Sequence, residues 1–104
     1  MSSPVEGDIF SKGTKKQITF VWGSNLAALT NLAGKLVNMT TGNNFTYNNS
    51  DISVADNGTG TIQITANLSE TGRYVAQFAA NNATLKEYSP EYGFKVVDPI
   101  LTGL

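Results

Sequence analysis

The chain has 104 residues, of which 40 % are hydrophobic and only 14 % are charged, and its formal net charge is −1. A chain of this length forms one domain around one hydrophobic core. The near-zero charge argues against nucleic-acid binding through a basic face. Cysteine and histidine are absent, which excludes a disulfide scaffold, thiol chemistry and the common zinc, haem and iron–sulfur sites. The composition predicts a domain that works by contact, without a cofactor.

The first eight residues, MSSPVEGD, contain neither the basic nor the apolar segment of a signal peptide. No apolar run approaches the roughly 18 residues that a membrane helix needs. Six Asn-x-Ser/Thr sequons occur, but an Asn- and Thr-rich β protein generates them without any link to glycosylation. We expect a protein that is made in the cytoplasm and does not bind a membrane.

Short runs of alternating apolar and polar residues recur along the chain, separated by Gly, Asn, Asp and Ser clusters. This spacing predicts an all-β sandwich or barrel. We expect about seven strands, drawn from the runs 16–22, 35–41, 45–47, 52–55, 61–66, 73–80, 85–88 and 92–97. The Asn57-Gly58 pair lies between two such runs and predicts a hairpin, because both residue types tolerate positive φ.

The alternation also predicts which side chains face the core. The inward set is Ile18, Phe20, Trp22, Val37, Met39, Ile62, Ile64, Tyr74, Ala76, Phe78, Ala80, Tyr92, Phe94 and Val96. The segment 26–33 is ambiguous, because its leucines have helical spacing but Gly and Asn flank it. One helical turn and a loop with buried leucines both fit this segment.

Catalytic side chains are sparse in this sequence. Without histidine, no Ser-His-Asp or Cys-His arrangement exists. Two carboxylate pairs remain, Glu87 with Glu91 and Asp51 with Asp56, and we interpret the second pair as turn caps because its spacing does not match a calcium loop. We therefore predict neither a metal site nor an enzyme.

Three aromatic residues, Phe45, Tyr47 and Tyr88, fall in Asn-rich or edge segments. Exposed aromatic rings beside amides stack on sugar rings, whereas the same residues also pack under loops. Packing is the favoured interpretation, and glycan binding is the alternative.

The stretch Glu70-Thr71-Gly72-Arg73-Tyr74 resembles the corner that precedes strand F in immunoglobulin-like domains. In that corner, Gly allows a sharp turn and the Tyr hydroxyl bonds back to upstream backbone. This sequence departs from the family at Ala76, where immunoglobulin domains have a cysteine. The expected fold is an Ig-like β-sandwich without the disulfide.

A second resemblance covers nearly the whole chain. Gly7, Asp8 and Phe10 are followed by ITFVW, KLVNM, ISVADNGTGTIQI, ETGRYVAQF and FKVVDPI in that order. This order is similar to the Ig-like N-terminal domain of tailed-phage baseplate upper proteins and related virion proteins. The resemblance implies a non-enzymatic virion structural protein, either a tail or baseplate adaptor or a capsid decoration, that docks to other virion proteins as an oligomer and leaves the host by lysis.

On this interpretation, residues 1–7 form a flexible arm, 8–98 the sandwich and 99–104 a C-terminal tail. The apolar residues of the tail, Ile100, Leu101 and Leu104, are candidates for partner binding, together with Phe45, Tyr47 and Tyr88. The alternative function is an Ig-like adhesion or carbohydrate-binding module on a cell or virion surface.

Overall fold

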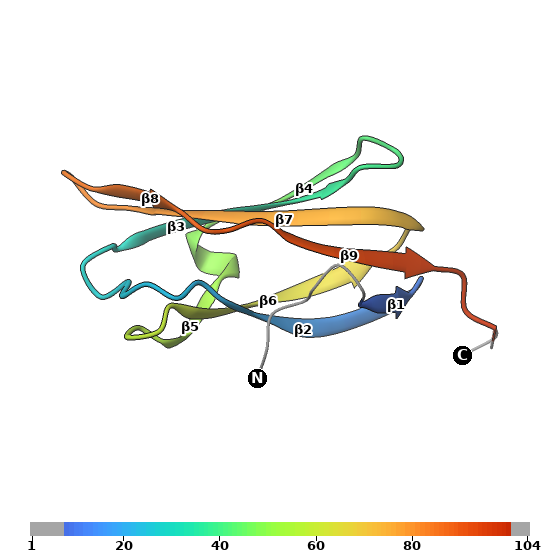
Figure 1. Cartoon of the computed structure of the whole chain (residues 1–104), viewed down its shortest axis with the longest axis horizontal. Helices are drawn as coiled ribbons and strands as arrows, with labels where there is room; N and C mark the ends of the chain where they lie inside the picture. Colours follow the sequence, from blue (N-terminus) through green and yellow to red (C-terminus); the bar gives the residue numbers. More distant parts are fainter. Residues whose placement is uncertain (1–7, 101–104) are drawn as a thin grey trace.

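The computed structural model describes residues 8–100 as two β-sheets packed face to face (Figure 1). The elements are β1 (Ile9–Ser11), β2 (Thr14–Val21), β3 (Asn31–Asn38), β4 (Asn44–Tyr47), the 3₁₀ turn η1 (Asn49–Asp51), β5 (Ser53–Asp56), β6 (Thr61–Leu68), β7 (Gly72–Asn81), β8 (Lys86–Tyr88) and β9 (Tyr92–Val97). The larger sheet has the order β1-β9-β7-β3-β4, with β8 paired to β7, and the smaller sheet has the order β2-β6-β5.

The strand orders are those of an immunoglobulin-like sandwich, in which strands B, E and D form one sheet and G, F and C the other. Neighbouring strands are antiparallel, except that β1 runs parallel to β9. The chain contains no cysteine, so hydrophobic packing takes the place of the usual inter-sheet disulfide. The predicted fold class is confirmed.

The core lies between the two sheets, and alternate side chains of β2, β6, β7 and β9 fill it as predicted. Phe20 on β2 is fully buried, and its ring centroid lies 4.8 Å from that of Phe78 on β7 and 5.0 Å from that of Tyr92 on β9. Tyr74 and Phe94 stack with their ring planes 3° apart. The Phe20 contacts join the smaller sheet to the larger one, whereas the Tyr74–Phe94 stack lies within the larger sheet.

The prediction for the third strand was wrong in its bounds and in its facing. The strand spans Asn31–Asn38 rather than 35–41, and Leu32, Leu36 and Asn38 face the core. Val37 is half-buried on the opposite face, and Met39 is 57 % exposed. The reason is Asn38, a polar residue at a core position, whose hydrogen bonds replace the water that burial removes.

Residues 26–30 form a loop with two buried leucines, Leu26 and Leu29, which is one of the two predicted alternatives, whereas residues 31–33 already belong to β3. Leu26 donates its backbone N–H to the carbonyl of Asn57, and this bond fixes the loop against the turn between β5 and β6. That turn forms the predicted hairpin, but its positive φ of 67° lies at Gly60 and not at Asn57 or Gly58. A Cβ at Gly60 would overlap the backbone oxygen of Ser24, so the close approach of the two loops requires glycine.

The structure has nine strands within residues 8–100, where the sequence indicated about seven. One extra strand is β1, a three-residue edge strand. The strands β8 and β9 correspond to two of the predicted runs, and they lie along one line, separated by Ser89-Pro90-Glu91, along which both pair with β7. Proline cannot donate to the ladder, so the line breaks at this point.

The corner before β7 contains the hydrogen bond that the immunoglobulin resemblance implies. The Tyr74 hydroxyl donates to the backbone oxygen of Glu70 at 2.8 Å. Gly72 has a φ of 144°, and a Cβ there would overlap the amide of Asn38. Hydrogen bonds from the side chains of Asn43 and Thr41 lower the pKa of Glu70, so this carboxylate ties the corner to the β3–β4 turn.

Replacing Tyr74 with phenylalanine removes that hydroxyl bond and leaves the ring in place. We expect the free energy of unfolding to fall by about 0.5–1.5 kcal/mol, measured by urea denaturation. Tyr88→Phe is the matched control, because Tyr88 is 60 % exposed and its change should leave the midpoint unaltered. Equal midpoints for Tyr74→Phe and the unmodified chain would show that the corner bond contributes nothing.

Candidate functional site

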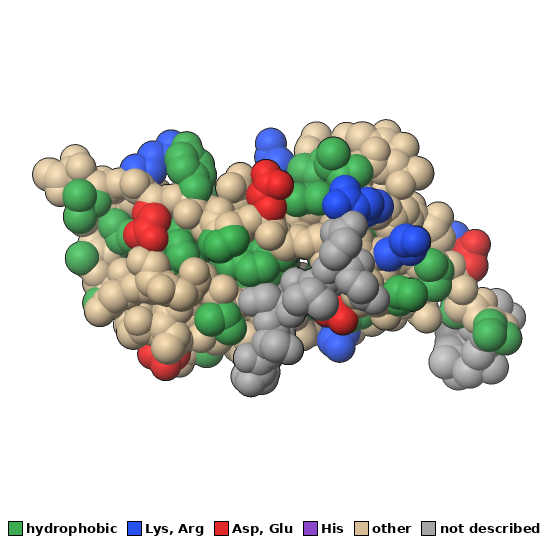
Figure 2. Space-filling view, in the orientation of Figure 1, with side chains coloured by type: hydrophobic (Ala, Val, Ile, Leu, Met, Phe, Trp, Pro, Cys, Tyr) green, Lys and Arg blue, Asp and Glu red, His purple; other side chains and the backbone are tan. Residues whose placement is uncertain are grey.

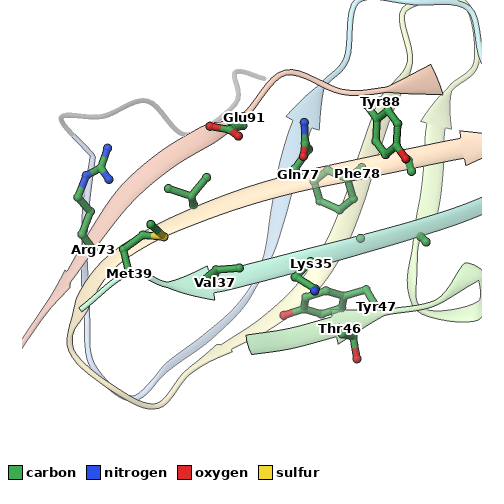
Figure 3. A pocket seen from close by; sticks show the side chains of 14 residues that line it. Lys35, Val37, Met39, Thr46, Tyr47, Arg73, Gln77, Phe78, Tyr88 and Glu91 are labelled. Atoms are coloured by element: carbon green, nitrogen blue, oxygen red, sulfur yellow. The ribbon is translucent and has the colours of Figure 1, made fainter. Parts of the chain in front are cut away.

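The candidate site is the face of the larger sheet that points away from the core, which we call the outer face. A hollow of about 690 Å³ lies on it, between Thr46 on β4 and Tyr88 on β8 (Figure 3). The side chains of Lys35, Val37, Gln77 and Glu91 also line it. The surface of the hollow is mostly apolar, which is typical of a surface that binds another molecule.

The pairing of strands arranges the outer face in rows. Val37 on β3 lies opposite Val75 on β7, and Val75 lies opposite Gly93 on β9. A second row crosses the same strands, with Ala33 opposite Ala79 and Ala79 opposite Tyr88 on β8. These two rows give the face an aliphatic centre that the sandwich core does not cover.

Between these two rows lies a polar one, in which Lys35 on β3 is opposite Gln77 on β7. Here Gln77 and Phe78 face three residues on the other side, Ser89, Pro90 and Glu91, so the ladder contains a one-residue bulge. The buried Ser89 hydroxyl accepts from the backbone N–H of Phe78 at 2.8 Å and fixes the bulge. The bulge places Glu91 at the rim of the hollow (Figure 3).

Basic residues lie between and around the two aliphatic rows. Four of the seven in the chain lie on the outer face, and they are Lys35, Arg73, Lys86 and Lys95. The Lys86 ammonium lies 5.0 Å from the centroid of the Tyr88 ring. Along the upper edge of Figure 2, where the larger sheet lies, basic and hydrophobic side chains alternate. The face therefore combines apolar area with charges that can fix the orientation of a bound partner.

The outer face of the smaller sheet has a different character. The side chains that β2 and β6 present there are mostly uncharged and polar, with Gln17 opposite Thr65 and Thr19 opposite Gln63. The Gln63 amide donates to the Thr19 hydroxyl at 3.2 Å, so part of this polar surface is satisfied within the sheet. Of the two sheets, the larger one is therefore the better candidate for a contact surface.

The aromatic residues singled out from the sequence separate into two groups. Phe45 and Tyr47 are half-buried and pack against the core, as the favoured interpretation held. Burial, with a contribution from the nearby Asp51 charge, raises the pKa of the Tyr47 hydroxyl. Tyr88 is 60 % exposed and lies at the hollow. One of the three aromatics is thus available for contact with a ligand.

The C-terminal tail gives little structural information. Ile100 is fully exposed, and Leu101 and Leu104 lie outside the described residues. The predicted arm, residues 1–7, lies outside them as well. Ile100 is not among the residues that line the hollow.

The sequence did not identify the strongest candidates on the outer face, which are Val37, Met39 and Val75. Val37 and Met39 were assigned to the core because both faces of their strand carry apolar residues. A signal was present in β7, where Val75 and Ala79 occupy outward positions that a solvated strand fills with polar side chains. Apolar residues on both faces of this strand are the sequence signal that could have located the outer face.

The carboxylates of Asp51 and Asp56 each accept a hydrogen bond from a backbone N–H group close to them in the sequence. The Asp51 side chain accepts from the backbone N–H of Asn48 at 2.9 Å, and the Asp56 side chain accepts from that of Gly58 at 2.9 Å. The turn-capping interpretation of this pair is confirmed. Within residues 8–100, no three His, Cys, Asp or Glu side chains gather closely enough to hold a metal ion.

None of the helical segments in the described part of the chain is long and apolar enough to span a membrane. No protein-family model matches the sequence, and no curated protein is similar to it. The geometry of the outer face, together with the sequence resemblance, is therefore the basis for a functional proposal.

Proposed function

We propose that the protein is a non-enzymatic docking module that binds through the outer face of the larger sheet. The observation that carries this proposal is the set of apolar side chains on that face: Val37 and Val75 are paired on the sheet and only half-buried, and Met39, in the turn that follows β3, is 57 % exposed. Apolar surface presented on regular strands costs free energy in the isolated chain, and a partner that covers it recovers that cost.

The system that we propose is the virion of a tailed phage, in which the domain is a tail or baseplate adaptor or a capsid decoration. The resemblance to Ig-like virion domains supports this assignment, and so does an Ig-like sandwich that is held without cysteines and so folds in a reducing cytoplasm. The few charges on the chain also favour close packing against neighbours, because few of them must be desolvated. Release by host lysis then brings the protein out of the cell.

Density-gradient centrifugation tests this role. Cells that express the protein from its own gene are lysed, and an antibody against the chain locates it in the gradient. We expect it to sediment with particles that contain DNA and to remain with them after nuclease treatment. Recovery at the top of the gradient alone would contradict a virion role.

A glycan-binding or adhesion module is the second candidate, and the exposed Tyr88 ring at the hollow favours it. Phe45 and Tyr47 do not contribute to it, because they pack against the core. A glycan array probed with the chain and with Tyr88→Ala distinguishes the two functions. Binding that Tyr88→Ala abolishes would favour the module, whereas an empty array favours protein docking.

A further inference from the structure

We propose that the partner of the outer face is a second copy of the chain, in a symmetric pair whose two-fold axis runs along β7 between the two facing sheets. This inference rests on the proposed function, since it names the occupant of the same surface. In such a pair each patch meets itself, so every contact between two different residues occurs twice. The outer face must therefore be complementary to its own copy.

The charges meet this condition. Lys35 on β3 lies opposite Gln77, on one side of β7. Glu91 lies on the other side of β7, just before β9, in the bulge that faces Gln77 and Phe78. Rotation about the β7 axis places Lys35 of one copy opposite Glu91 of the other, and Glu91 opposite Lys35. Because the rotation repeats this contact, the dimer contains two Lys35–Glu91 ion pairs. Gln77 meets its own copy, and an amide both donates and accepts hydrogen bonds.

The shapes of the side chains meet the same condition. In one row, β7 separates Val37 from Gly93, and in the other it separates Ala33 from Tyr88. The rotation therefore sets the valine against the glycine and the tyrosine against the alanine. A large side chain faces a small one in both rows, which allows two sheets to interdigitate at the usual spacing of about 10 Å.

The area is sufficient for a pair. Four strands at about 4.8 Å spacing and about eight residues at about 3.3 Å give each copy a contact of roughly 500 Å². Two copies together bury roughly 1,000 Å², which is at the lower limit for a specific interface. We therefore expect a weak dimer. Arg73 lies near the beginning of β7 and meets its own copy across the axis, but its side chain is exposed, so that water screens the repulsion between the two guanidinium groups.

Sedimentation equilibrium from micromolar to millimolar concentrations tests the pair, with the unmodified chain, Lys35→Glu, Glu91→Lys and the double variant. We expect a species of about twice 11.1 kDa for the unmodified chain. Each single reversal should weaken dimerisation by about tenfold or more, and the double variant should restore it. Both substituted side chains, Lys35 and Glu91, are exposed, and circular dichroism checks that each variant folds.

Lys15→Glu is the matched control, because Lys15 is an exposed lysine on β2 in the smaller sheet. It should dimerise as the unmodified chain does. A monomer at every concentration would overturn the inference, and so would a dimer that the single reversals leave unchanged or the double variant fails to restore. A monomeric chain that still sediments with particles would refute only the second copy, whereas absence from particles would refute the virion role.

Discussion

Replacing Asn38 with alanine is expected to lower the free energy of unfolding by about 3 kcal/mol or more, as measured by urea denaturation. The Asn38 side chain is fully buried. Its amide nitrogen donates to the Glu70 carboxylate and to the Thr71 carbonyl, both at 2.9 Å. Its oxygen accepts from the backbone N–H groups of Thr40 and Thr41. Alanine would leave these groups without their partner, at about 1–3 kcal/mol for each one that stays buried.

The control for this change is Asn67→Ala, since Asn67 is an exposed asparagine, the next-to-last residue of β6 in the smaller sheet. We expect that variant to stay within about 0.5 kcal/mol of the unmodified chain. Equal effects of the two substitutions would show that the Asn38 network does not hold the corner before β7.

Replacing Phe20 with alanine should cost about 3–5 kcal/mol, a large part of the stability of about 5–15 kcal/mol that is usual for one domain. Phe20 is fully buried, and its ring contacts Phe78 and Tyr92 across the space between the sheets. No disulfide joins the two sheets, so this aromatic contact is one of the main links between them. Thermal unfolding followed by calorimetry measures the loss.

Phe45→Ala provides the comparison, because Phe45 is half-buried at the edge strand β4. Its removal should cost clearly less than the removal of Phe20. If both variants lost the same stability, the account of a core centred on Phe20 would be wrong.

The alternation of apolar residues predicted the core side chains of β2, β6, β7 and β9, because one face of each strand is covered by the opposite sheet. It failed at β3, where the core position is held by Asn38 and apolar residues face outward. Hydrophobicity cannot assign such a strand, since the hydrogen bonds that make Asn38 a core residue come from Glu70 and Thr71, over thirty positions along the chain.

The candidate site was less predictable than the fold, because it depends on register between distant strands. Val37 and Val75 are adjacent only through the pairing of β3 with β7, and Glu91 reaches the hollow only because a bulge precedes β9. The resemblance to immunoglobulin-like domains did locate the Tyr74 corner, whose bond is formed within five residues. Local geometry was thus predictable from the sequence, whereas the surface built by non-local pairing was not.

The measurement that tests the account most directly is the rate at which hydrogen peroxide oxidises Met39, followed by peptide mass spectrometry. Met39 is 57 % exposed and lies on the outer face, so it reports on whether that face is covered. The rate is compared between the purified chain at low concentration and the chain in the particle fraction, with the unfolded chain as reference. We predict oxidation that is several-fold slower in the particle fraction. Equal rates in the two samples would contradict docking through the outer face.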